Sequence, residues 1–143
     1  MSERSPRKKH SPQQRAEAKG QRIVQLAKHI CEAAGAAVEV APKVVHWLPK
    51  PDGSGRFPLS TRHDFWGWAD LLACYPDGRR EGYQVTTLEH VSDRRAKMLK
   101  NGFPYTAGDA ILGYKGGRDR HFRIFRGPRF VDWEGETWRP VKA

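Results

Sequence analysis

The chain has 143 residues, of which 26 are Lys or Arg and 16 are Asp or Glu, so its formal net charge is +10. This length fits one domain with a tail, and the basic excess excludes an acidic solvating chain. Cys31 and Cys74 lie far apart in the sequence, which excludes a miniprotein built on disulfides. No apolar run approaches the ~20 residues that a membrane span needs, and no apolar stretch follows the basic N-terminus. We therefore expect a cytoplasmic protein with reduced thiols and no membrane partner.

The basic residues gather in two segments. Residues 1–22 contain seven bases against two acids, and residues 90–126 contain nine bases against three acids. Two such segments on a small domain favour a polyanionic partner, because each neutralised phosphate releases condensed counterions. We expect this partner to be DNA, with RNA as an alternative. A solvated basic surface without a polyanion is the other interpretation of the same charges.

In chain order, residues 1–11 lack apolar periodicity and are predicted to be a disordered basic arm, followed by a single domain at 12–143. Ser11 and the Pro-Gln-Gln that follows it predict the start of a helix, and Gly35 predicts its end. Gly20 is expected to weaken the first half, so that the helix is secure from about residue 21. The helical spacing is carried by Ile23, Leu26, Ala27, Ile30 and Ala34.

Strand and turn signals alternate along the middle of the chain. Residues 37–47 are rich in Val and predict a strand, and Pro42 limits that strand to an edge or a bulge. Residues 49–63 contain three prolines and two glycines and predict a loop. Residues 66–75 and 82–87 predict two strands joined as a hairpin through Pro-Asp-Gly.

The last third predicts a short helix and more strands. Residues 92–100 predict the helix, and residues 109–114 and 121–125 predict two strands around a Gly-Gly turn. An aromatic pair on either side of Glu134-Gly135 predicts a small terminal hairpin over residues 130–138. The order of elements predicts an α/β fold in which a mixed central sheet is flanked by helices.

Three polar residues on the two hairpin strands form the most specific constellation. Gln84 and Thr86 are two residues apart and share a face of their strand. If the strands pair around the Pro-Asp-Gly turn, Asp70 lies nearly opposite them. A carboxylate beside further oxygen donors is typical of a site for Mg²⁺, or for Mn²⁺ in its place.

The segments Asp64-Phe-Trp-Gly-Trp-Ala-Asp70-Leu-Leu and Gly82-Tyr-Gln-Val-Thr-Thr87 resemble the PD-(D/E)xK nuclease superfamily, within its branch related to Holliday-junction resolvases. The resemblance covers residues 14–115 and implies a restriction-endonuclease-like αβββαβ core. It implies metal-dependent hydrolysis of phosphodiester bonds in branched or duplex DNA by a homodimer. Asp70 matches the aspartate of the second strand, and Gln84-Val85-Thr86 stands at the acid-x-Lys triplet.

The triplet departs from the family pattern in two places. Gln84 replaces the acid, so its carbonyl would bind the metal without contributing charge. Thr86 replaces the lysine and would orient water through a hydroxyl group. The catalytic candidates are Asp70, Gln84 and Thr86, and the metal candidates are Asp70, Gln84 and Asp64, with His90 or Glu89 assisting a water. The alternative is that Gln84 and Thr86 are ordinary surface residues of a strand and Asp64 is a solvated loop acid.

Basic residues follow this constellation in the sequence and are candidates for phosphate contacts. Those on the predicted second helix and on the Gly-rich hairpin are Arg94, Arg95, Lys97, Lys100, Lys115, Arg118 and Arg120. A solvated basic face is the alternative. Three functions remain open at this point: a metal-dependent endonuclease, a catalytically inactive nucleic-acid-binding module on the same fold, and a structural protein that docks on an acidic partner.

Overall fold

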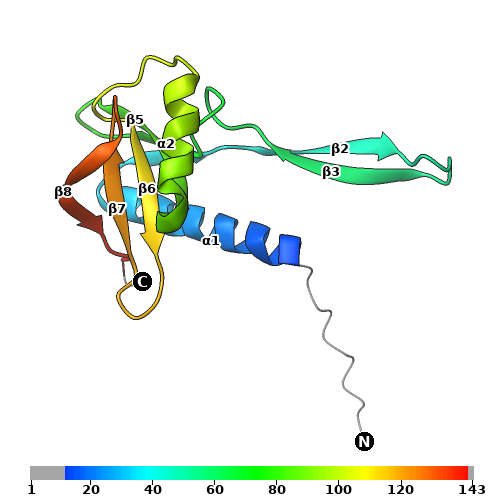
Figure 1. Cartoon of the computed structure of the whole chain (residues 1–143), viewed down its shortest axis with the longest axis horizontal. Coiled ribbons are helices and arrows are strands. Elements are labelled where there is room, and N and C mark those ends of the chain that lie inside the picture. Colours follow the sequence, from blue (N-terminus) through cyan, green and yellow to red (C-terminus); the bar gives the residue numbers. More distant parts are fainter. Residues whose placement is uncertain (1–11, 142–143) are drawn as a thin grey trace, which may run out of the picture.

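Six strands form a mixed sheet in the order β1-β4-β5-β6-β7-β8, and β2 and β3 form a separate two-stranded sheet (Figure 1). This computed structural model describes residues 12–141. β5 and β6 run parallel, and the other neighbouring pairs of the sheet are antiparallel. The elements are α1 (Pro12–Ala33), β1 (Ala37–Val40), β2 (Lys43–Pro49), β3 (Arg56–Arg62), β4 (Leu71–Cys74), β5 (Arg80–Thr87), the 3-10 turn η1 (Leu88–His90), α2 (Val91–Lys100), β6 (Ala110–Lys115), β7 (His121–Arg126) and β8 (Val131–Trp138).

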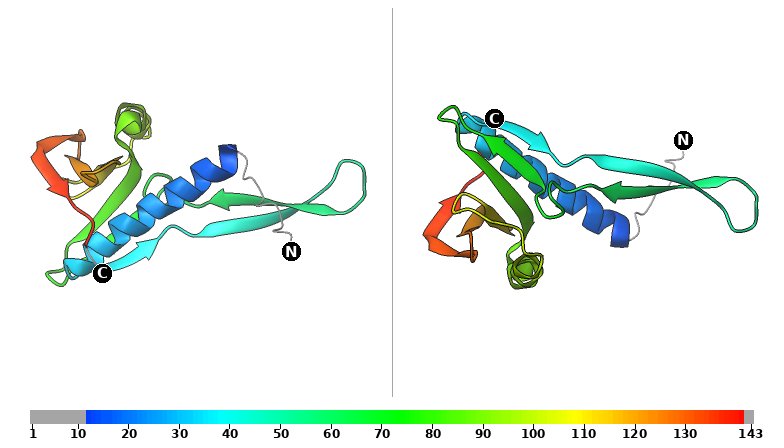
Figure 2. Two further views of the ribbon diagram at one scale, coloured as in Figure 1. Left: turned by 90° about the horizontal axis from the view of Figure 1, so that it is seen from below. Right: turned by 90° about the horizontal axis from the view of Figure 1, so that it is seen from above.

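The two helices cover opposite faces of the six-stranded sheet (Figure 2). Ile111 of β6 packs in the cluster that contains α2, whereas its neighbour Leu112 packs in the cluster that contains α1. Successive side chains of a strand point to opposite faces, so the sheet separates two apolar cores. The predicted α/β class, with a mixed sheet flanked by helices, is confirmed. The buried α1 residues are Ile23, Val24, Ala27 and Cys31.

The segment after β1 differs from the prediction. The single strand predicted at 37–47 is wrong, because Pro42 separates β1 in the main sheet from β2 in the small one. Residues 49–63 were predicted as a loop, but seven of them form β3, which pairs antiparallel with β2 along its whole length. We call residues 43–62 the β2–β3 arm. Figure 1 shows that it projects away from the main sheet on the side opposite β8.

Two other predicted boundaries are corrected. The strand predicted at 66–75 begins only at Leu71, because Trp66 and Gly67 have positive φ angles in a tight turn. The predicted terminal hairpin is wrong, since β8 is one strand that pairs with β7. Glu134 and Gly135, which were expected to form the hairpin turn, have positive φ angles where the register of that pair shifts. Such a backbone suits a bulge as well as a turn.

The first helix is longer than its glycine suggested. α1 is continuous from Pro12, so Gly20 does not restrict the helix to residue 21 and beyond. The predicted cap at Ser11 and the predicted arm at 1–11 lie outside the described residues. Both Cys31 and Cys74 are free thiols. Within residues 12–141, no helix combines the length and apolar character needed to cross a membrane.

Candidate active site

Asp70 and Gln84 lie side by side where the β4–β5 hairpin meets the preceding turn. The hairpin pairs Leu71 with Tyr83, and Asp70 N donates to the Tyr83 carbonyl, so Asp70 continues the register opposite Gln84. Gln84 Nε2 donates to Asp70 Oδ2 at 2.7 Å, and Val85 N donates to the same oxygen at 2.8 Å. Asp70 is 4% exposed and Gln84 is 7% exposed. The prediction that Asp70 lies nearly opposite Gln84 and its neighbours on the paired strand is therefore confirmed.

Aromatic packing holds the turn before Asp70. Trp68 is buried against Gly82, where an added Cβ would come within 2.7 Å of Trp68 Cη2, so this close approach requires glycine. Trp66 has a φ of 54°, which is unusual for a bulky residue, and its ring centroid lies 5.5 Å from that of Phe103. The packing fixes the chain two residues before Asp70 and leaves Trp66 more than half exposed on the surface.

A cavity of about 630 Å³ adjoins the Asp70–Gln84 pair. Its walls come from α1, the turn before β4, the end of β5 and the start of α2. Site residues that were predicted in separate parts of the sequence therefore line one cavity. The predicted residues that line this cavity are Asp64, Asp70, Gln84, Thr86, Glu89, His90 and Arg94.

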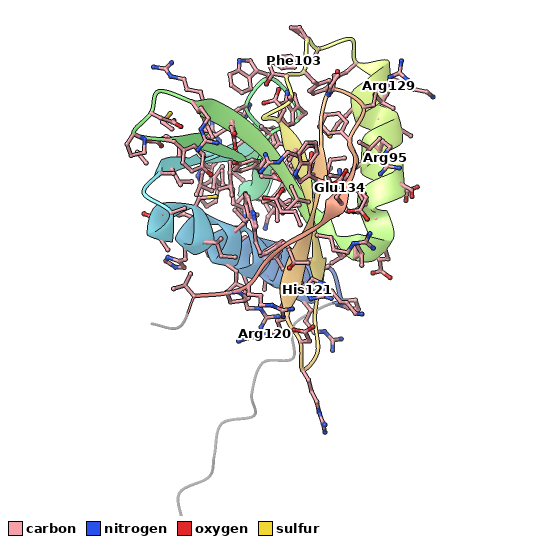
Figure 3. The ribbon with its side chains drawn as sticks, turned by 90° about the vertical axis from the view of Figure 1, so that its left-hand side faces the viewer. Arg95, Phe103, Arg120, His121, Arg129 and Glu134 are labelled. Atoms are coloured by element: carbon pink, nitrogen blue, oxygen red, sulfur yellow. The ribbon has the colours of Figure 1, made fainter. Side chains whose placement is uncertain are left out.

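Sequence reasoning missed the contribution of α1 to this cavity. Lys19 lines it, and Lys19 also lines a neighbouring cavity of about 250 Å³ together with Arg22 and Arg120. Figure 3 shows Arg120 and His121 at the β6–β7 turn, at the far end of the sheet from Phe103. The missed signal was the spacing of Arg15, Lys19 and Arg22, which are four and three residues apart and therefore share one helix face.

The other predicted phosphate contacts lie outside the main cavity. The Arg95 guanidinium lies 5.5 Å from the Phe125 ring centroid, and its Nε is buried without a hydrogen-bond partner among residues 12–141. Arg95 therefore packs on the protein body rather than extending into solvent. Four more predicted contacts are exposed, two on α2 and two at the β6–β7 turn: Lys97, Lys100, Lys115 and Arg118.

The donor types in the cavity suit a hard cation. Asp70 and Asp64 carry carboxylate oxygens, Gln84 carries an amide oxygen, and Mg²⁺ prefers oxygen ligands and keeps several waters. Thr87 Oγ1 in the same wall is buried, and it has no hydrogen-bond partner in the described part of the chain. Across that same part, no three His, Cys, Asp or Glu side chains are grouped as a metal site.

No protein-family model, curated protein or solved structure matches this chain. The site is therefore defined by its own geometry, which combines a buried carboxylate–amide pair, a cavity and flanking cations.

Proposed function

We propose that this protein binds DNA and hydrolyses its phosphodiester bonds at the Asp70–Gln84 cavity, as an endonuclease-like protein that uses Mg²⁺ or Mn²⁺. The observation that carries the proposal is the buried Asp70–Gln84 pair in a cavity that Lys19 and Arg94 also line. Metal-dependent hydrolysis of a phosphodiester needs oxygen ligands for a cation, with cationic groups nearby to hold the phosphates. RNA is the alternative polymer, and the assay below separates the two.

The order of elements supports the resemblance to the PD-(D/E)xK nucleases. That resemblance implies a helix, a three-strand meander, a second helix and a further strand. Here α1 precedes the antiparallel β1-β4-β5 meander, and α2 leads into β6, which is parallel to β5. The β2–β3 arm is an insertion between the first two strands of this core. Asp70 immediately precedes the second strand of the meander, and Gln84-Val85-Thr86 lies on the third.

Each residue of the cavity has a defined role in the proposal. Asp70, Asp64 and Gln84 hold the cation through oxygen atoms. A bound Mg²⁺ would lower the pKa of a water and stabilise negative charge on the scissile phosphate. Thr86 orients a water through its hydroxyl group, and Lys19 and Arg94 bind phosphate oxygens through charged hydrogen bonds. Two copies acting together, as the resemblance implies, would cut two strands.

The catalytically inactive binding module is the second candidate, and the Asp70–Gln84 hydrogen bond favours it. The Gln84 amide group donates to Asp70, so the pair satisfies itself without a cation between the two side chains. Thr86 brings no positive charge to an attacking water. If this candidate is correct, Gln84→Glu combined with Thr86→Lys creates cleavage in a protein that is otherwise inert.

The test is cleavage of labelled duplex, single-stranded and branched DNA, and of single-stranded RNA, in Mg²⁺, Mn²⁺ or EDTA. We expect metal-dependent cutting of DNA that falls about 100-fold or more in Asp70→Asn. Asparagine suits the test because the hydrogen bonds from Gln84 Nε2 and Val85 N both reach Asp70 Oδ2, and a carbonyl oxygen can accept them there. The variant therefore removes the charge and can keep these two hydrogen bonds.

Asp77→Asn is the matched control, since Asp77 lies in the exposed turn at the opposite end of the β4–β5 hairpin. It should cut at the wild-type rate. Tight DNA binding without cleavage in any metal contradicts the nuclease and supports the binding module. Binding to neither DNA nor RNA at moderate salt contradicts both and leaves an acidic protein partner.

A further inference from the structure

The β2–β3 arm exposes apolar side chains on both of its faces, Val45 and Trp47 on one and Leu48, Phe57 and Leu59 on the other. Of the ten large apolar side chains that are exposed among residues 12–141, half belong to the arm. Figures 1 and 2 show the arm extending clear of the main sheet, so both of its faces meet solvent. Isolated two-stranded ribbons are marginally stable, and clustered exposed apolar groups mark binding surfaces. The exposed side chains are Val45, Trp47, Leu48, Phe57 and Leu59.

Charge identifies the kind of partner that fits this surface. The arm carries two lysines and two arginines against one acid, Asp52. A second copy of the chain carries the same arm, with four bases against one acid, so repulsion opposes docking of one arm on another. Pro49 and Pro58 also remove backbone N–H donors from the ribbon, which disfavours addition of a third strand. A polyanion matches the basic charge of the arm and does not need backbone N–H donors from the ribbon.

We propose that the arm enters the minor groove of duplex DNA and presses apolar side chains, led by Trp47, against the base steps. The identity of the partner as DNA rests on the proposed function. Strands of seven residues span about 23 Å, which is enough to follow a groove over a large part of one helical turn. Apolar wedges flanked by cations are the chemistry by which arms bind and bend DNA from the minor groove.

Three adjoining cavities, each lined in part by basic residues, lead from the base of the arm to the candidate active site. A cavity of about 410 Å³ between α1 and the base of the arm is lined by Arg22 and Lys43. Arg22 and Lys19 line the next cavity along α1, and Lys19 lines the cavity of the Asp70–Gln84 pair. DNA held by the arm would therefore extend along α1 toward that pair.

The test compares two tryptophans of similar exposure in the full-length protein. Trp47 is 60% exposed on the arm, and Trp133 is 52% exposed on β8. Affinity for a labelled duplex, measured by fluorescence anisotropy, should fall about tenfold in Trp47→Ala and stay within about twofold in Trp133→Ala. The salt dependence should be unchanged in Trp47→Ala, whereas Lys50→Gln should reduce the log–log salt slope by about 1.

A second measurement identifies the groove. A minor-groove-binding polyamide, distamycin, should compete with the wild-type protein, and end-to-end energy transfer across the duplex should report bending that Trp47→Ala reduces. Competition by a major-groove ligand alone would place the arm in the other groove and overturn the proposal. Circular dichroism of each variant checks that the body remains folded.

The outcomes separate this inference from the proposed function. If the wild type binds DNA and both Trp47→Ala and Lys50→Gln bind equally well, the arm proposal is overturned and the proposed function stands. If the wild type binds no DNA, the proposed function is overturned, and the inference about the arm is overturned with it. If sedimentation shows a dimer that Trp47→Ala dissociates, the arm docks on a second copy, which also overturns the proposal.

Discussion

One carboxylate oxygen of Asp70 accepts hydrogen bonds from two buried donors, so Asp70 stabilises the fold as well as forming part of the candidate site. Oδ2 accepts from Gln84 Nε2 and from Val85 N. Asp70→Ala would remove this acceptor from both, and a buried donor without an acceptor costs about 1–3 kcal/mol. We expect Asp70→Ala to lower the free energy of unfolding by about 2 kcal/mol or more in urea titrations. Asp70→Asn should lose less than half of that, because its carbonyl oxygen can accept both bonds.

The control for this stability measurement is Asp77→Asn, which breaks only an exposed ion pair with Arg79 and should alter the unfolding free energy by less than about 1 kcal/mol. Equal losses in Asp70→Ala and Asp70→Asn would contradict the argument, because the carboxylate charge would then matter more than the two hydrogen bonds. That result would also show that Asp70→Asn perturbs the fold, so Gln84→Ala would have to replace it in the cleavage assay.

The pairing of Asp70 with Gln84 could be predicted because it is local. A short Pro-Asp-Gly turn fixes the register of a hairpin, and the register then places residues on adjacent strands opposite one another. Lys19 could not be placed in the same way. It is more than 40 residues from Asp70 in the sequence, and it reaches the cavity only because α1 packs across the sheet through Ile23 and Val24.

At the scale of whole elements, sequence patterns succeeded where burial imposes periodicity. The buried residues of α1 lie at 23–31, in the half that the sequence predicted to be secure, and β6 and β7 were predicted because they lie in the core. The β2–β3 arm was missed because its second strand alternates only briefly, with Phe57 and Leu59 on either side of Pro58, and a proline argues against a strand. Its prolines and glycines then gave the pattern of a loop.

Two adjacent arginines of α2 are expected to behave differently. Arg94 is exposed and lines the cavity, whereas Arg95 packs over the Phe125 ring. Arg94→Ala should weaken DNA binding and reduce the log–log salt slope by about 1, because one phosphate contact is lost. Arg95→Ala should leave that slope nearly unchanged and lower the unfolding free energy by about 0.5–1 kcal/mol, through the lost cation–π contact.

Anisotropy titrations at several salt concentrations and urea unfolding of both variants measure these effects. The two substitutions remove the same charge from the same helix, so each variant is the control for the other. A larger change of salt slope in Arg95→Ala than in Arg94→Ala would contradict the assignment and would mean that Arg95 leaves the Phe125 ring when DNA binds.

Across the whole molecule, charge differs between the two ends of β5. Near its start, Glu81 is buried and accepts from Tyr83, and it also contacts Arg79 and Arg126. Arg126 in turn donates twice to Glu136. Arg79 and Arg126 at this end are therefore paired with acids. Lys19 of α1 and Arg94 of α2 place positive charge at the other end, at the candidate site, which orients a polyanion toward that side of the protein.

Buried thiol and phenol groups near the start of β5 govern the response of the protein to alkaline pH. Burial raises the pKa of Cys31 from 9.0 to about 11 and that of Tyr75 from 10.0 to about 12, and it raises the pKa of Tyr83 as well. The folded protein therefore keeps protons that the unfolded chain loses above about pH 9. Stability from these groups is complete below pH 9 and is lost progressively as the pH rises through 11 and 12.

Removing one of these groups should reduce the fall in unfolding free energy at alkaline pH. Between pH 8 and pH 10, the unfolding free energy of Cys31→Ala should fall by about 1 kcal/mol less than that of the wild type, because the variant has no buried thiol to keep neutral. Val24→Ala, buried on the same helix, removes apolar contacts without removing a titratable group, so its curve should run parallel to the wild type. Deprotonation of lysines affects all three proteins alike and cancels in the comparison. Parallel curves for Cys31→Ala and the wild type would contradict this argument. They would show that the thiol loses its proton as easily in the folded protein as in the unfolded chain, contrary to its burial between α1 and the sheet.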